Sequence, residues 1–149
     1  MSEIMHALYR GDRGRARKLA AGAELDVFEA AALGEAARLQ EVLAAEPKLA
    51  GARSDDDFTP LHYAAFFDGP EAARVLVEHG ADVNAFADNE LGVHPLNSAA
   101  AAQQSEVAAI LLEAGADPNG RTRSGHSPLD VALANGDAEL AALLRSHGG

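Results

Sequence analysis

The feature that most constrains this chain is a segment that recurs about every 33 residues. The stretch TPLHYAAFFDGPEAARVLVEHGADVNA, which begins at Thr59, is followed by HPLNSAAAAQQSEVAAILLEAGADPNG and SPLDVALANGDAELAALLRSHGG. The prolines Pro60, Pro95 and Pro128 mark the register, at spacings of 35 and 33 residues. A unit of this length is too thin to bury its own apolar face, so neighbouring units must stack. The sequence therefore predicts a solenoid.

Each unit carries the signals of two short helices. Thr59 is suited to cap the first helix, and Pro60 fits the position that needs no N–H donor. Small alanines follow, which allow the next unit to approach closely. A second apolar stretch ends at Gly80, which is suited to a left-handed helix terminus. In the next unit His94 replaces the capping threonine.

The chain resembles an ankyrin-repeat protein, and the motifs TPLHYAA and GADVNA carry the resemblance. It covers residues 28–149 well and residues 1–27 loosely. The stretch VFEAAALGEAARLQEVLAAEPKLAGA, from Val27, is a weaker copy, and MHALYRGDRGRARKLAAGAELD, from Met5, is weaker still. The resemblance implies an all-α solenoid of helix-turn-helix units with projecting β-hairpin-like fingers. We expect one domain, divided into an N-terminal capping helix pair (1–26), an atypical repeat (27–58), two repeats (59–91 and 92–124) and a C-terminal capping repeat (125–149).

The same resemblance places the elements along the chain. Helices are expected near 3–10, 12–21, 27–33, 35–45, 60–67, 71–79, 95–102, 105–114, 128–134 and 137–146. Fingers are expected near 50–59, 84–94 and 119–127. The segment between Asn84 and Pro95 is two residues longer than the one between Asn119 and Pro128, so the second finger is longer than the third. A lengthened loop can carry function, or it can be neutral drift.

His62 has two possible roles, catalytic or structural. Catalysis would require a partner base or nucleophile beside it. Asn97 and Asp130 occupy the same place in the next two units, and a hydrogen-bonding role tolerates such an exchange. The resemblance likewise assigns a structural role to this histidine, so we interpret His62 as structural and expect no catalytic residue.

Composition excludes several classes of function. The net charge of −11 would repel a nucleic-acid backbone, and the absence of cysteine excludes thiolate metal sites and suits a reducing cytoplasm. No long apolar run indicates a signal peptide or membrane span, so we expect a cytoplasmic protein that contacts no membrane. A composition rich in alanine, with more arginine than lysine, suggests a bacterial gene. The basic run from Arg10 to Lys18 is interpreted as a solvated helix face, with docking on an anionic surface as the minor alternative.

No metal or cofactor site is expected. No two histidines stand four apart on one helix, and SDDD at 54–57 lacks the alternating oxygen ligands of a calcium loop. A solvated turn is the simpler reading of SDDD. There Asp57 takes the place of a finger glycine, and aspartate tolerates a left-handed backbone better than most residues.

The remaining function is recognition of another protein, and we expect a non-catalytic interaction module that is a monomer. The resemblance assigns partner binding to variable positions on the fingers and at the ends of the first helices. The matching residues are Asp55, Asp56, Phe58, Phe66, Phe67, Glu90, Leu91, Val93, Arg123, Ser124, His126 and Asn135. Packing between repeats is the alternative role for Phe66 and Phe67. Aromatic groups with acids around them suit a partner with basic residues. The alternative functions are an accessory or regulatory subunit of an enzyme, or a catalytic site on the stack.

Overall fold

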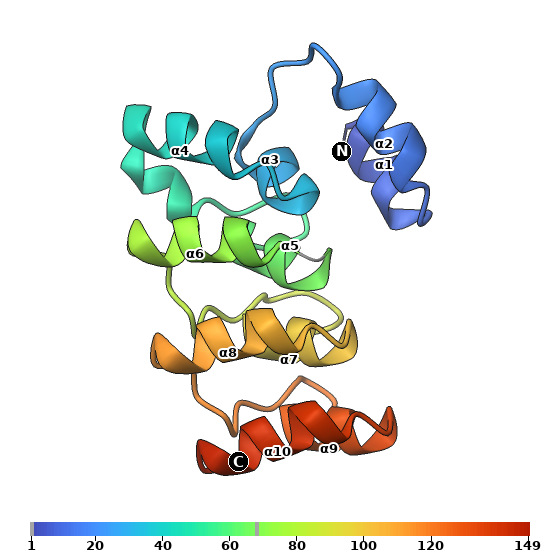
Figure 1. Ribbon diagram of the computed structural model, residues 1–149, viewed down its shortest axis with the longest axis vertical. Coiled ribbons are helices and arrows are strands. Elements are labelled where there is room, and N and C mark those ends of the chain that lie inside the picture. Colours follow the sequence, from blue (N-terminus) through green and yellow to red (C-terminus); the bar gives the residue numbers. More distant parts are fainter. Residues whose placement is uncertain (1, 68) are drawn as a thin grey trace.

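The structure is a computed structural model that describes residues 2–67 and 69–149. These residues form ten short α-helices and one 3-10 helix, with no strand among them, which confirms the predicted all-α solenoid. Figure 1 shows the helix pairs stacked in a column, with the N-terminal pair set to one side of it. The helices are α1 (Glu3–Tyr9), α2 (Arg13–Ala20), α3 (Val27–Leu33), α4 (Ala36–Ala45), η1 (Pro47–Gly51), α5 (Pro60–Phe66), α6 (Pro70–Glu78), α7 (Pro95–Ala101), α8 (Ser105–Glu113), α9 (Pro128–Ala134) and α10 (Ala138–Ser146).

Three of the first helices, α3, α5 and α9, begin at a reciprocal cap. In α5, the Thr59 hydroxyl accepts a hydrogen bond from the N–H of His62, and the His62 ring accepts one from the N–H of Thr59. Two N–H groups that lack a partner within the helix are thereby satisfied. The same exchange of bonds pairs Asp26 with Glu29 before α3 and Ser127 with Asp130 before α9.

The helices form two layers that run the length of the column (Figure 1). The first helices α3, α5, α7 and α9 contact one another in turn, and so do the second helices α4, α6, α8 and α10. Small side chains on the first helices let their backbones come close. Those with no exposed surface are Ala30, Ala31, Ala32, Ala64, Ala65, Ala99, Ala100 and Ala132.

The second helices supply many of the large side chains that are fully buried. Each of them places one leucine at the same register, and all four leucines are 0% exposed: Leu43, Leu76, Leu111 and Leu144. Burying a leucine contributes about 1.5–3 kcal/mol. Because each leucine packs between neighbouring pairs, the core is a continuous column rather than a central cluster.

Polar side chains in the GADxN motif fix the spacing between repeats. The Asp82 carboxylate accepts from the N–H of Asn84, which folds the turn after α6. The Asn84 amide then bridges to the next repeat, donating to the Gly115 carbonyl at 3.2 Å and accepting from the N–H of Asp117 at 2.7 Å. Asn119 repeats the donation toward Gly148. The motif therefore encodes a hydrogen-bonded link as well as a turn.

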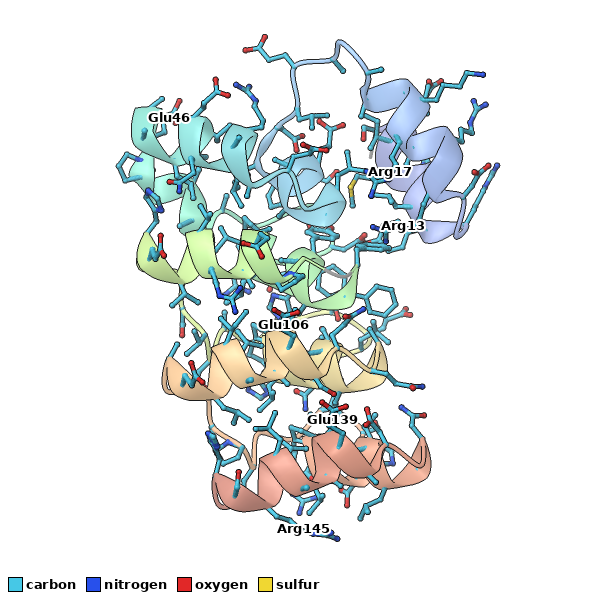
Figure 2. The ribbon with its side chains drawn as sticks, in the orientation of Figure 1. Arg13, Arg17, Glu46, Glu106, Glu139 and Arg145 are labelled. Carbon is cyan, nitrogen blue, oxygen red and sulfur yellow. The ribbon has the colours of Figure 1, made fainter. Side chains whose placement is uncertain are left out.

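The N-terminal pair is attached to the column at few points. α1 contacts α3, and Arg13 Nη1 donates to the Phe67 carbonyl at 2.9 Å. Figure 2 shows Arg13 reaching from α2 toward the end of α5. The other basic side chains of this run are exposed and form no ion pair with a described residue: Arg10, Arg15, Arg17 and Lys18.

The expected helices agree with the observed ones to within a residue at each end. The exception is the segment after α4, which we expected to be part of a finger from residue 50. Pro47–Gly51 instead forms η1, in which Ala50 is 5% exposed and packs into the core. Proline at the start of the turn favours this helix, and burial of Ala50 holds it against the stack.

The role of Asn84 leads to a stability prediction. Replacing Asn84 by alanine removes two hydrogen bonds between repeats and should lower the free energy of unfolding by about 1–2 kcal/mol. Urea titration followed by circular dichroism measures this change. Asn135→Ala is the matched control, since the exposed Asn135 side chain forms no hydrogen bond with a described residue. Equal stability of both variants would contradict the linking role.

Candidate functional site

Three fingers project from the column, and each is closed by the same backbone bond. An N–H donates to a carbonyl across the base of the loop in 54–58, 87–93 and 122–126. The bond encloses three residues in the first and third fingers and five in the second, in agreement with the longer finger seen in the sequence. Asp57 has φ +64° and Gly92 has φ +56°, so the expected left-handed backbone at Asp57 is confirmed.

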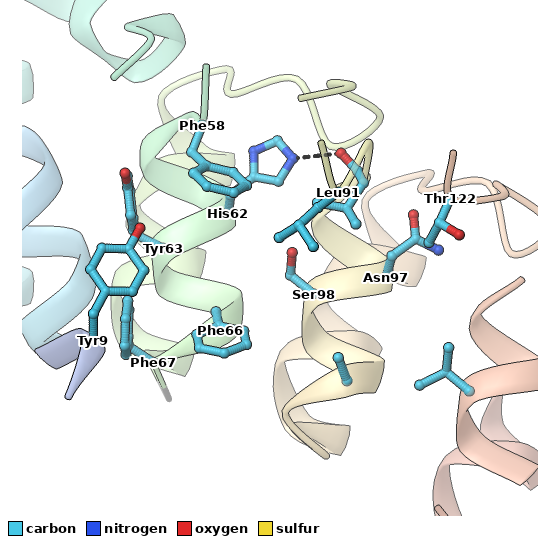
Figure 3. Close-up of a pocket in the computed structure, with 13 residues that line it drawn as sticks. Tyr9, Phe58, His62, Tyr63, Phe66, Phe67, Leu91, Asn97, Ser98 and Thr122 are labelled. Atoms are coloured by element: carbon cyan, nitrogen blue, oxygen red, sulfur yellow. Dashed lines mark hydrogen bonds between the residues drawn. The ribbon is translucent and has the colours of Figure 1, made fainter. Parts of the chain in front are cut away.

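The fingers and the first helices enclose a pocket of about 400 Å³, here called the finger pocket. Figure 3 shows an aromatic group at one end, Thr122 at the other, and Phe66 and Leu91 between them. Almost all of its wall is apolar. The lining residues are Tyr9, Phe58, His62, Tyr63, Phe66, Phe67, Leu91, Val93, Asn97, Ser98, Ala101, Thr122 and Val131.

The aromatic end of the finger pocket is a packed cluster. The Phe67 ring lies edge-to-face against Tyr9 and Phe66, with centroids 5.6 and 5.1 Å apart, and stacks parallel to Tyr63 at 6.4 Å. The Tyr63 hydroxyl donates to Ser54 Oγ at 3.0 Å, which ties the cluster to the first finger. Such ring pairs each contribute about 0.5–1.5 kcal/mol beyond their burial. The wall at this end is therefore held together by several ring contacts and one hydrogen bond.

Exposed apolar side chains gather at the finger pocket. Among the described residues, four large apolar side chains are exposed: Tyr9 (43%), Phe66 (49%), Leu91 (63%) and Leu133 (53%). Three of these, all except Leu133, line the finger pocket. Single exposed apolar residues are ordinary, whereas a group of them around one apolar hollow marks an interaction site.

His62 forms part of the wall and has both ring nitrogens in use. Nδ1 accepts from the N–H of Thr59 at 3.1 Å, so it carries no proton. Nε2 therefore holds the ring proton and donates it to the Val93 carbonyl at 3.0 Å. The side chain links the cap of α5 to the second finger, and neither nitrogen remains to act as a base. This geometry agrees with the structural role expected from the sequence.

Burial keeps this imidazole neutral. Burial lowers the pKa of His62 to about 4. The hydrogen bond to the Val93 carbonyl opposes this by raising the pKa, and the nearby Arg53 guanidinium lowers it further. The shift is consistent with removal of the ring from water.

Other side chains take over the histidine position in the other repeats. In α7, the Asn97 amide oxygen accepts from the N–H of His94 at 2.8 Å and from His94 Nδ1 at 3.0 Å, and its nitrogen donates to the Gly120 carbonyl. In α9, hydrogen bonds from the backbone and hydroxyl of Ser127 lower the pKa of Asp130. His62, Asn97 and Asp130 are chemically different, yet each accepts a hydrogen bond from the N–H of the residue that caps its helix.

Exposed carboxylates lie on the first and second fingers. Asp55, Asp56 and Glu90 are exposed, and none forms an ion pair with a described residue. Asp57 and Asp88, in contrast, are held by Arg53 and Arg123 at 3.2 and 2.6 Å. The carboxylates of the first group are therefore available to a partner.

The structure divides the residues that the sequence assigned to partner binding. Phe58, Phe66, Phe67, Leu91 and Val93 line the finger pocket, and Asp55 and Asp56 line a smaller hollow beside it that is more polar than the finger pocket. Phe67 is only 7% exposed, so its main role is packing, and Phe66 is the exposed ring of the pair. The remaining residues lie outside the pocket: Glu90, Arg123, Ser124, His126 and Asn135.

Sequence reasoning missed Tyr9. The N-terminal pair lacks the TPLH motif, which hid its register. The cap of α1 is Ser2, and Tyr9 lies seven residues after it, as Phe66 lies seven after Thr59 and Ala101 seven after His94. Counting from the caps would have placed Tyr9 at the same variable position.

The described residues contain neither a cluster of metal ligands nor a helix that could span a membrane. No group of three histidine, aspartate or glutamate side chains in residues 2–67 and 69–149 could hold a metal ion. No helix in the same ranges is long and apolar enough to cross a membrane.

The stacked pairs, their repeated caps and the projecting fingers define a helical-repeat solenoid. A sequence model of the family described as Ankyrin repeats (3 copies) matches residues 4–122, which is well over half of the chain. The chain therefore belongs to the ankyrin-repeat family, whose members are generally protein-interaction modules. A search of curated proteins found no match.

The buried neutral His62 predicts a specific dependence of stability on pH. Its pKa is about 4 in the folded state and about 6.5 in the unfolded chain, so the unfolded state takes up the proton first as the pH falls. The stability that depends on a neutral His62 is therefore fully present above pH 6.5, and it is lost as the pH falls toward 4. From pH 7 to pH 5 this group alone removes about 2 kcal/mol of stability.

His62→Asn isolates that contribution, because Asn97 already serves the same position without titrating. The variant should be less stable than the wild type at pH 7, and its stability should fall less between pH 7 and pH 5. Urea titrations at both values measure the difference. His126→Asn, at an exposed histidine, is the control and should keep the wild-type slope. A wild-type slope in His62→Asn would overturn the assignment.

Proposed function

We propose that this protein is a non-catalytic interaction module that binds a segment of another protein in the finger pocket. One observation carries the proposal: Tyr9, Phe66 and Leu91, three exposed apolar side chains from separate parts of the chain, meet at one apolar pocket. An apolar side chain of the partner is the complementary group. Such an anchor in a well-packed pocket dominates many protein interfaces.

The chemistry of the wall supports binding rather than catalysis. Both nitrogens of His62 are engaged in hydrogen bonds, and the tyrosine hydroxyl of Tyr63 is bonded to Ser54. A catalytic site needs a nucleophile or base directed at a bound substrate. The His62 and Tyr63 side chains are directed instead at the protein's own backbone and side chains.

The charges around the pocket indicate the character of the partner. Asp55 and Asp56 lie beside the aromatic end, Glu90 adjoins Leu91, and the whole chain carries −11. Lysine or arginine next to the partner's apolar anchor would meet these carboxylates. Exposed charges of this kind act mainly on the association rate and are screened over about 10 Å at 0.1 M salt.

A library of random displayed peptides tests the proposal directly. Peptides selected on the folded protein should carry an aromatic or large aliphatic residue with lysine or arginine nearby. Association of a selected peptide should slow as the salt concentration rises. Selection of acidic peptides, or of peptides without an apolar anchor, would contradict the proposed chemistry.

Variants of exposed apolar residues locate the binding surface. Phe66→Ala should weaken binding of a selected peptide by about 1–3 kcal/mol, the range of an interface anchor. Leu133→Ala is the matched control, because Leu133 is 53% exposed but lies outside the finger pocket. Phe67 is unsuitable for this test, since its truncation would damage the buried aromatic cluster.

Charge variants complete the test. Asp56→Lys should slow association with the basic peptide, whereas Glu78→Ala and Glu113→Ala on α6 and α8 should leave both rates unchanged. Dissociation and association rates from surface plasmon resonance separate these effects. Loss of binding in the α6 and α8 variants, with none in Phe66→Ala, would show that the face is wrongly assigned.

A further inference from the structure

The second finger contains two residues that the other fingers lack. Its closing bond joins Ala87 to Val93 and encloses five residues, whereas Ser54–Phe58 and Thr122–His126 enclose three. Matched from Gly92, which has the left-handed backbone of Asp57 and Gly125, the additional residues are Asp88 and Asn89. These two residues take part in contacts that join the three fingers.

Asn89 connects the second finger to the first and shapes its own loop. Its Nδ2 donates to the Asp56 carbonyl at 2.6 Å. Its Oδ1 accepts from the N–H groups of Leu91 and Gly92, both at 3.0 Å. The neighbouring N–H of Asp88 donates to Asp57 Oδ2 at 2.8 Å. The backbone on either side of Leu91 is thus fixed by a side chain that the shorter fingers do not contain.

Arg123 connects the second finger to the third. Its guanidinium bonds to Asp88 Oδ1 at 2.6 Å through Nη2 and to the Asn89 carbonyl at 3.0 Å through Nε. The N–H of Arg123 donates to the Gly92 carbonyl at 2.9 Å, and the guanidinium lies 5.6 Å from the centroid of the Phe86 ring. A single arginine therefore holds both additional residues.

Gly92 allows this arrangement. A Cβ at residue 92 would lie 2.5 Å from Cβ of Arg123 and 3.0 Å from the Phe86 ring. Together with the left-handed backbone, this close approach leaves no room for a side chain. Arg123 thus passes directly over the backbone next to Leu91.

We propose that Asp88, Asn89 and Arg123 form a clasp that holds Leu91 in place as a wall of the finger pocket. Leu91 then acts as a specificity-determining residue, and the three clasp residues are positioning residues that act through it. A preformed wall spares the cost of ordering the loop when the partner binds. The inference rests on the proposed function, since it concerns the partner's anchor. The clasp gives the longer finger a role, which is to position Leu91. Arg123 contributes to that role although it does not line the pocket.

The first experiment needs no partner. Asn89→Ala and Arg123→Ala should raise amide hydrogen exchange at Leu91 and Gly92 by about fivefold or more, as the loop loses its bonds. Glu90→Ala is the control in the same loop, because the Glu90 side chain bonds to no described residue. Unchanged exchange in Asn89→Ala and Arg123→Ala would show that there is no clasp.

The second experiment measures whether the clasp acts through Leu91. With a peptide selected from the random library, Arg123→Ala should weaken binding about three- to tenfold, mainly through faster dissociation. In the Leu91→Ala background, Arg123→Ala should cause no further loss. Arg121→Ala, at another finger arginine, should leave the affinity unchanged.

The outcomes separate the two proposals. Faster exchange with unchanged affinity in Arg123→Ala would overturn the role of the clasp in recognition while leaving the interaction module intact. Additive losses in the double variant would mean that Arg123 contacts the partner itself, which also overturns the proposal. A library that yields no binder would contradict the interaction module, and the role of Leu91 in specificity would fall with it.

Discussion

The helix pairs of this protein bury their leucines by stacking on neighbouring pairs, and every other feature depends on that stacking. Leu76 and Leu111 have no exposed surface because neighbouring pairs enclose them. The first helices must come close for this to happen, and their alanines permit it. A stack built in this way has a fixed repeat distance, so a loop on one pair always faces the corresponding loop on the next.

Polar side chains use that fixed distance to hold the fingers. Asn84 bonds to the turn of the next repeat, and His62 bonds from the cap of α5 to the second finger. The fingers are consequently tied to the helices beneath them. Because the loops are held on both sides, Leu91 and Phe58 can act as walls of a pocket instead of mobile side chains.

The sequence predicted the structure well where a residue type favours one local backbone conformation. Threonine before proline predicted the start of α5, and Asp57 in place of a finger glycine predicted its left-handed backbone, which the structure has. The outcome for Phe66 and Phe67 could not be read in the same way. Two adjacent side chains at the end of a helix face different surroundings. The contact with Tyr9 that buries Phe67 depends on how the N-terminal pair packs. The clasp was equally hidden, since Arg123 meets Asp88 only after three loops are stacked in register.

The most direct test of the account is to find where a bound peptide lies on the folded chain. Methyl and amide chemical shifts, recorded by NMR while a selected peptide is titrated in, report this at single residues. The account predicts that the largest changes fall at Leu91, Ala101 and Val131, which line the finger pocket from three successive repeats. Changes confined to α6, α8 and α10, with these three signals unmoved, would contradict it.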